Sequence, residues 1–271
     1  MRADGKYVDL HAADSSLPTD LAQLLSLGSD GLRRAAAALK SGAPIDPAKV
    51  KLLPPVPRPE KILCIGLNYA DHARETGKEP PPEPVVFNKF VTALRASGDA
   101  IVLPRLSNQV DFEAELVAVI GTGGRHIAKE KALAHVAGYT CGNDVSARDW
   151  QNHKPGRQWL LGKSFDSFAP LGPELVTADE VGNPSDLRIQ LRIDGRSMQD
   201  SRTSQLIFGV AELVSYISGV CTLTPGDLIF TGTPPGVGFA RKPPVFLQPG
   251  NTVEVELERI GVLRNTVTVE K

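Results

Sequence analysis

The sequence predicts an α+β protein that is mostly β, built as a mixed β-sandwich roll with a small α/β amino-terminal domain. Beyond residue 60, segments rich in Val, Ile and Leu recur at short intervals and often end in glycine, as strands do. Only two long helical patterns interrupt them, too few for regular βαβ winding. The stretch KLLPPVPRPEK, residues 51–61, carries four prolines and cannot continue a helix or a central strand. We therefore place the domain boundary here, giving residues 1–58 and 59–271.

The elements follow from local patterns in chain order. Residues 19–28 and 29–42 each have an acidic or hydroxyl cap, an apolar period of helical spacing and a closing glycine, which predicts two helices. Two further helices are expected at residues 129–138 and 208–219. The expected strands lie at residues 61–66, 100–104, 115–121, 187–195, 227–233, 252–261 and 262–270.

Charge and cysteine content exclude several classes of protein. Thirty basic residues oppose thirty-one acidic ones with no basic run, so nucleic acid is not an expected partner. No apolar run reaches the 18 or so residues of a membrane span, and the first residues lack the core of a signal peptide, so we expect a cytoplasmic protein that does not enter membranes. Three distant cysteines form neither a disulfide framework nor a Cys-x-x-Cys zinc motif.

The segment DFEAEL, residues 111–116, places three acids at alternate positions before an apolar run. In a strand Asp111, Glu113 and Glu115 share one face, and each adjacent pair repels by about 2 kcal/mol at a spacing of roughly 7 Å. If Asp144 approaches Glu113 and Glu115, the oxygen-only set favours Mg²⁺, Mn²⁺ or Ca²⁺ over zinc. The alternative is an acidic strand face exposed to water.

Three further segments carry residues that could act on a substrate. His72 and Glu75 share a face of a short helix, where they could activate water or form an ordinary surface pair. The segment GRQWLLGKSF has the wrong spacing for a phosphate loop, so Lys163 could place positive charge beside a developing enolate or be a surface lysine. Thr233 ends a strand in a turn rich in Gly and Pro that could bind a carboxylate or be a plain turn.

Five motifs in this order resemble the fumarylacetoacetate hydrolase family over roughly residues 60–271, and the domain-containing protein 2 subgroup of that family in particular. These motifs are GLNYADHARE, DFEAELVAVIG, NDVSARDWQ, GKSFDSFAPLGP and LIFTGTPPGVG. The resemblance implies the family's β-roll fold, a homodimer and a small oxo-acid substrate.

The resemblance also implies roles for individual residues. The ligands of a divalent metal, usually Mg²⁺ or Mn²⁺, would be Glu113, Glu115 and Asp144. The residues that hold or polarise substrate oxygens would be Arg148, Gln151, Lys163 and Thr233. The catalytic pair on a lid helix would be His72 and Glu75. Asp111 has no role assigned by the resemblance.

The expected function is hydrolysis of a C–C bond in an acylpyruvate-like or 2,4-diketo acid through a metal-bound enolate. The first alternative uses the same site as an oxaloacetate decarboxylase or tautomerase, or as a 2-hydroxyhepta-2,4-diene-1,7-dioate isomerase. The second alternative is a non-catalytic protein that a metal ion merely braces.

Overall fold

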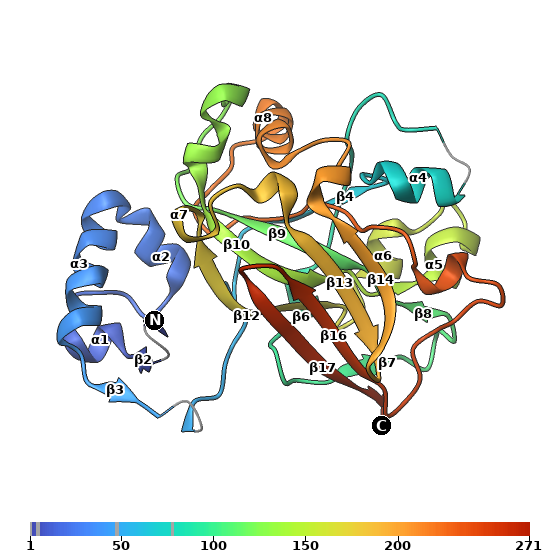
Figure 1. The fold of residues 1–271 in the computed structure, drawn as a ribbon, viewed down its shortest axis with the longest axis horizontal. Helices are drawn as coiled ribbons and strands as arrows, with labels where there is room; N and C mark the ends of the chain where they lie inside the picture. Colours follow the sequence, from blue (N-terminus) through green and yellow to red (C-terminus); the bar gives the residue numbers. More distant parts are fainter. Residues whose placement is uncertain (1, 4–5, 47–48, 77–78) are drawn as a thin grey trace.

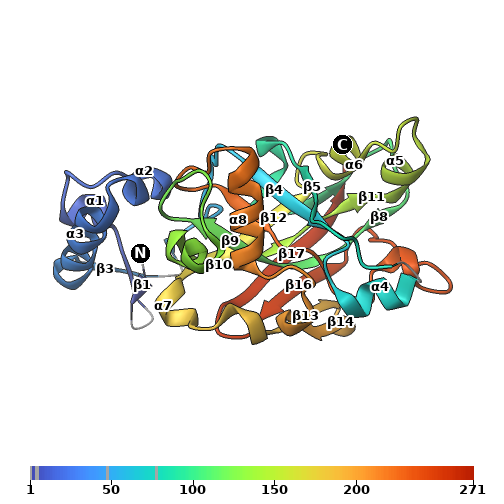
Figure 2. The same ribbon diagram turned by 90° about the horizontal axis from the view of Figure 1, so that it is seen from above.

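The computed structural model describes residues 2–3, 6–46, 49–76 and 79–271, without the side chains of residues 2, 3, 72, 73 and 76. Two large sheets pack face to face and enclose the main core (Figure 1). Helix α8 (Val210–Val220) covers the outer side of the larger sheet (Figure 2). The α+β, mostly β prediction is confirmed.

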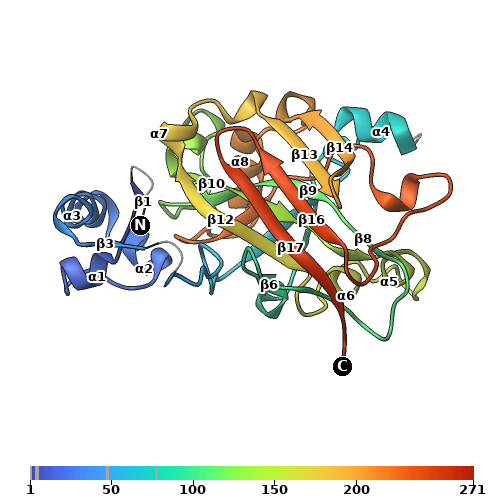
Figure 3. The same cartoon turned by 60° about the horizontal axis from the view of Figure 1, so that its bottom comes forward.

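The larger sheet has seven strands in the order β5-β4-β15-β9-β10-β12-β6. Their bounds are Val85–Asn88 (β5), Ile62–Gly66 (β4), Leu228–Phe230 (β15), Ala114–Ile120 (β9), Val136–Asn143 (β10), Ala169–Thr177 (β12) and Leu94–Arg95 (β6). The five-stranded sheet has the order β14-β13-β16-β17-β7, and Figure 3 shows its β17 beside β12. The bounds of its strands are Arg196–Arg202 (β14), Arg188–Ile193 (β13), Thr252–Leu257 (β16), Gly261–Val269 (β17) and Ile101–Leu103 (β7).

Short elements frame one end of this sandwich. They are the paired strands β8 (Val110–Asp111) and β11 (Ser146–Ala147), and the helices α4 (Ala70–Thr76), α5 (Arg148–His153) and α6 (Trp159–Lys163). Helix α7 (Ala178–Val181) lies at the opposite end, against β10 and β12 (Figure 1). Strand β9 lies between β15 and β10, and every residue of it is buried. A central strand covered on both faces should be apolar throughout, so Glu115 within β9 departs from the rule and requires a compensating environment.

The amino-terminal segment forms a small three-stranded sheet with three helices. Its elements are β1 (Arg2–Ala3), β2 (Lys6–Val8), α1 (Leu10–Ala13), α2 (Leu21–Ser26), α3 (Gly28–Ser41) and β3 (Pro44–Ile45). Leu17, Leu24, Ala35 and Ala38 form a separate buried cluster, whereas Leu25 joins the main core. The boundary at residue 58 stays a prediction, because α2 takes part in both cores.

One predicted helix is partly wrong. Residues 129–138 divide into a 3₁₀ helix, Lys129–His135, and the first residues of strand β10. Gly138 lies so close to β12 that an added Cβ would overlap the Val176 carbonyl. The glycine therefore allows close strand pairing, which a pattern of apolar residues does not reveal.

Candidate metal centre and active site

Glu113, Glu115 and Asp144 converge in the interior. Their exposed fractions are 7%, 1% and 0%, and one ligand oxygen from each lies within 4.8 Å of the others. The pairing of β9 with β10 brings them together, because Glu115 lies opposite Gly142 and Asp144 N–H donates to the Glu113 carbonyl at 2.9 Å. The alternative of an acidic face exposed to water is therefore wrong.

Three buried cations contact two of these acids. Lys163 Nζ lies 2.8 Å from Glu113 Oε2 and 2.6 Å from Asp144 Oδ2. Arg148 Nη2 donates to Glu113 Oε1 at 2.6 Å, and Lys89 donates to Asp144. Burial alone would raise the pKa of Glu113, but the charges of Lys163 and Arg148 outweigh it and lower that pKa to about 2.

Glu115 lacks such compensation. Its Oε2 accepts a hydrogen bond from Gly232 N–H at 2.7 Å, and within the described chain no cation forms an ion pair with it. Burial, followed by the negative charges of Asp144 and Glu113, raises its pKa well above the usual value. The centre thus retains one acid whose charged form a further cation would stabilise.

The acid cluster fits a hard divalent cation. Ligand oxygens at about 2.0–2.6 Å from such an ion are separated from one another by roughly 3–5 Å, which matches the spacing of Glu113, Glu115 and Asp144. All three ligands are carboxylates, as Mg²⁺, Mn²⁺ and Ca²⁺ prefer. The structure therefore supports a divalent metal at this cluster.

A cavity of about 110 Å³ opens onto Glu113 and contains most of the other predicted residues. Arg148, Gln151, Lys163 and Thr233 line it together with apolar side chains. Helices α5 and α6 supply the first three of these residues, and Thr233 follows β15. The alternative of a surface lysine is wrong for Lys163, which is 2% exposed.

The predicted His72 and Glu75 pair is described only in part. The side chain of His72 lies outside the described residues, so its contact with Glu75 stays a prediction. Both carboxylate oxygens of Glu75 accept from Gly236 N–H, at 3.0 and 3.2 Å. This contact attaches helix α4 to the turn that follows Thr233.

Sequence reasoning missed Lys89 and Gln199. Lys89 follows β5 and is 3% exposed, and its place among apolar residues in VVFNKF was a signal of an inward-pointing charge. Gln199 in β14 joins the two sheets, since Oε1 accepts from Ala114 N–H at 2.9 Å and Nε2 donates to Thr233 Oγ1 at 2.8 Å. No local pattern marked Gln199.

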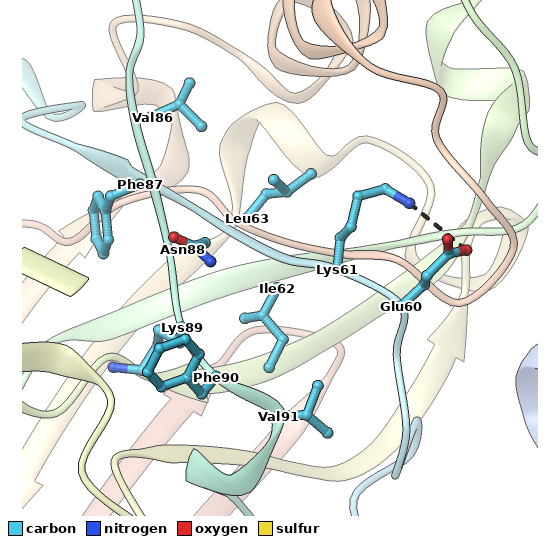
Figure 4. Close-up of a pocket in the computed structure, with 10 residues that line it drawn as sticks. All are labelled: Glu60, Lys61, Ile62, Leu63, Val86, Phe87, Asn88, Lys89, Phe90 and Val91. Atoms are coloured by element: carbon cyan, nitrogen blue, oxygen red, sulfur yellow. Dashed lines mark ion pairs between the residues drawn. The ribbon is translucent and has the colours of Figure 1, made fainter. Parts of the chain in front are cut away.

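A larger cavity of about 430 Å³ lies elsewhere, at the sheet edge formed by β4 and β5 (Figure 4). Its lining is mostly apolar, and the ion pair drawn there joins the neighbouring residues Glu60 and Lys61. The ammonium of Lys89 bonds to Asp144 in the interior. The larger cavity therefore lacks the convergent polar groups of an active site.

Fold and site together define a class of two-sheet β-roll proteins with a buried carboxylate cluster beside a fixed lysine. The chain belongs to the fumarylacetoacetate hydrolase family, because the model of the fumarylacetoacetate hydrolase C-terminal domain matches residues 61–268.

Relatives from Bos taurus and Homo sapiens are both named mitochondrial oxaloacetate tautomerase FAHD2A. They are 48% and 47% identical over 264 residues, which is 97% of this chain and 84% of each relative. These matches support the domain-containing protein 2 subgroup. The predicted cytoplasmic location is wrong on this comparison, because those relatives are named mitochondrial. Among the described residues, no helix is long and apolar enough to cross a membrane.

Solved structures resemble the whole chain or most of it. A fumarylacetoacetate hydrolase from Exiguobacterium antarcticum has a TM-score of 0.86 and 35% identity, covering 99% of this chain and 94% of that one. A 2-hydroxyhepta-2,4-diene-1,7-dioate isomerase from Mycobacterium marinum has a TM-score of 0.72 and 38% identity, and the match covers 84% of each chain. A fumarylpyruvate hydrolase from Pseudomonas aeruginosa, solved with Mn²⁺ and pyruvate, has a TM-score of 0.72 and 38% identity. That match covers 83% of this chain and 94% of the hydrolase.

Proposed function

We propose that this protein is a divalent-metal-dependent enzyme that converts a small 2-oxo acid through its enol form. The observation that carries this proposal is the fixed position of the Lys163 ammonium between Glu113 and Asp144, at a cavity lined by further polar donors. The reaction we favour is keto–enol tautomerisation of oxaloacetate or a close analogue. The names of the relatives that match 97% of the chain support this choice.

Lys163 provides the positive charge at the reacting oxygen. Burial would lower the pKa of its ammonium, but the charges of Asp144 and Glu113 outweigh burial and raise it above the usual value, so the group stays protonated. It can therefore donate to the 2-oxo oxygen as negative charge develops there. A divalent cation held by Glu113, Glu115 and Asp144 would supply Lewis-acid polarisation of substrate oxygens.

Gln151 and Thr233 would orient the substrate through donors that their protein contacts leave available. Gln151 Oε1 accepts from Arg148 Nη1 at 2.8 Å, so its amide N–H groups can face a ligand. Thr233 Oγ1 accepts from Gln199 Nε2 at 2.8 Å, which directs its own hydrogen elsewhere. Both residues line the cavity, where they could bind carboxylate oxygens.

Tautomerisation moves one proton from C3 of the substrate to the 2-oxo oxygen. We assign the removal of the C3 proton to His72, and the anchoring of its helix to Glu75 and Gly236. A proton from solvent water completes the enol at that oxygen, and His72 returns the C3 proton to solvent, so no atom is gained or lost. We also propose that the protein forms a homodimer.

Hydrolysis of an acylpyruvate is a second candidate, favoured by the apolar side of the cavity. Phe87 and Trp159 pack edge to face with ring centroids 5.4 Å apart, and Val237 and Phe239 line the same cavity. Such a wall suits an uncharged acyl group, whereas a second carboxylate would lose hydration there without an additional cation. In this reaction His72 would take a proton from the attacking water.

Absorbance assays on metal-stripped and reloaded protein test both candidates. We expect the protein to accelerate ketonisation of enol-oxaloacetate, to lose this activity with a chelator and to regain it with Mn²⁺. Full activity in the stripped protein would contradict the metal-dependent scheme. Metal-dependent cleavage of acylpyruvates without any effect on oxaloacetate would replace the first candidate with the second.

A further inference from the structure

Asp111 is a fully buried acid that lies outside the metal cluster. Its Oδ1 accepts from Phe112 N–H at 2.8 Å and from Gly238 N–H at 2.7 Å. Its Oδ2 accepts from Phe239 N–H at 3.0 Å and from Arg148 Nε at 2.8 Å. An ionised carboxylate has about four lone-pair sites, and these four donors fill them. Asp111 must therefore act through its neighbours and not as a ligand.

One of those neighbours is the arginine of the cavity. The Arg148 guanidinium is planar, so a bond to Nε fixes the direction of its two other nitrogens. Nη2 donates to Glu113 at 2.6 Å, and Nη1 donates to Gln151 at 2.8 Å. Asp111 thereby sets the orientation of two side chains that line the cavity.

The other neighbours belong to the turn that holds helix α4. Gly238 and Phe239 begin a short 3₁₀ helix, Gly238–Ala240, and their N–H groups point at Asp111. Two residues earlier in the same turn, Gly236 N–H donates to Glu75 of α4. The carboxylate of Asp111 thus lies between the cavity and the attachment point of α4.

We propose that Asp111 is a positioning residue that joins the cavity arginine and the attachment of helix α4 into one unit. The part that concerns substrate binding by Arg148 rests on the proposed function. In Asp111→Asn the side chain keeps its shape, but an NH₂ group replaces one of the two oxygens. This group cannot accept the two hydrogen bonds that the oxygen accepted, and it faces their two donors. This variant should therefore hold both the Arg148 side chain and helix α4 less firmly.

Oxalate binding tests the effect on the cavity, and amide hydrogen exchange tests the effect on helix α4. Oxalate is a planar mimic of a 2-oxo acid, and its affinity can be measured by calorimetry at saturating Mn²⁺. We expect Asp111→Asn to bind oxalate at least tenfold more weakly than the parent protein. We also expect faster amide exchange in residues 70–76 of the variant.

Asp227→Asn is the matched control. Asp227 is also fully buried and accepts from two backbone N–H groups, those of Lys61 at 3.0 Å and Thr224 at 2.7 Å, and an ion pair joins it to the Lys61 ammonium at 3.1 Å. A merely structural loss would affect both variants alike. We expect Asp227→Asn to lose stability while oxalate affinity stays within twofold and exchange in α4 is unchanged.

The outcomes separate this inference from the proposed function. Oxalate binding and α4 exchange in Asp111→Asn equal to those of the parent protein would overturn the inference. Absence of oxalate binding in the parent protein would contradict the proposed function, and the exchange comparison would then decide the role of Asp111 alone. If Asp111→Asn fails to fold, Asp111→Glu displaces the carboxylate while keeping its charge and permits the same comparison.

Discussion

Lys163 Nζ lies 2.6 Å from Asp144 Oδ2, with the two side chains 2% and 0% exposed. If Asp144 binds the metal ion as we propose, a lysine so close to it would compete with the ion and also serve the reaction. Its positive charge repels a cation at the acid cluster, yet the same charge can stabilise an enolate. Affinity for the ion and turnover should therefore change in opposite directions when the charge is removed.

Lys163→Met should lower kcat by about 10²- to 10³-fold, because one donor to the developing oxyanion is lost. The same change should tighten Mn²⁺ binding by about tenfold, because a neighbouring like charge is removed. Steady-state kinetics and titration calorimetry measure the two effects. Lys51→Met, at a lysine side chain that is 78% exposed, is the control and should change neither. Weaker Mn²⁺ binding in Lys163→Met would contradict the proposed geometry.

Glu115→Gln should stabilise the metal-free protein by about 1–2 kcal/mol, because a buried acid without a cation becomes neutral. The same variant should lose the rise in stability that Mg²⁺ or Mn²⁺ gives the parent protein, since a ligand that binds only the folded state stabilises it. Urea unfolding with and without the ion measures both effects. A variant that is less stable without metal but still responds to it would show that Glu115 is not a ligand.

The alternation of acids in DFEAEL correctly grouped Glu113 with Glu115, although strand β9 begins only at Ala114, but it could not show that the two acids are buried. Burial depends on the partner strand β10 and on three cations that come from distant segments. Asp144 was placed by the order of family motifs, because no local pattern links residues 115 and 144. Long-range strand pairing supplies that link.

Strand β10 shows the same limit for the fold. Its sequence VAGYTCGN has two glycines and little apolar alternation, so it is not among the expected strands, and its first residues fall within the helix predicted at residues 129–138. Gly142 packs so tightly that an added Cβ would lie 2.6 Å from the ring of Phe230. Such close approach is set by other strands of the sheet, here β15, and is not visible in local sequence.

Lys89→Met should destabilise the metal-free protein by about 3 kcal/mol, because it leaves Asp144 with one fewer buried partner. A bound divalent cation should recover part of this loss, since it neutralises the same acid. Chemical unfolding at several Mn²⁺ concentrations measures the recovery. Lys129→Met removes an exposed ion pair with Glu212 and should have little effect in either condition. Equal losses at all Mn²⁺ concentrations would argue against Asp144 as a ligand.

Gly238→Ala should destabilise the protein by about 2 kcal/mol or more, because the added methyl group has no room. Its Cβ would overlap the Val245 carbonyl and lie 2.7 Å from Asp111 Oδ1, so the turn must move away from that carboxylate. Gly219→Ala is the matched control, since Gly219 lies in helix α8 with nothing within 4 Å of the added Cβ. There alanine should stabilise the protein by about 0.5–1 kcal/mol through helix propensity. Thermal and urea unfolding should therefore show changes of opposite sign in the free energy of unfolding of the two variants. A Gly238→Ala variant as stable as the parent protein would show that the turn can shift without cost to the fold.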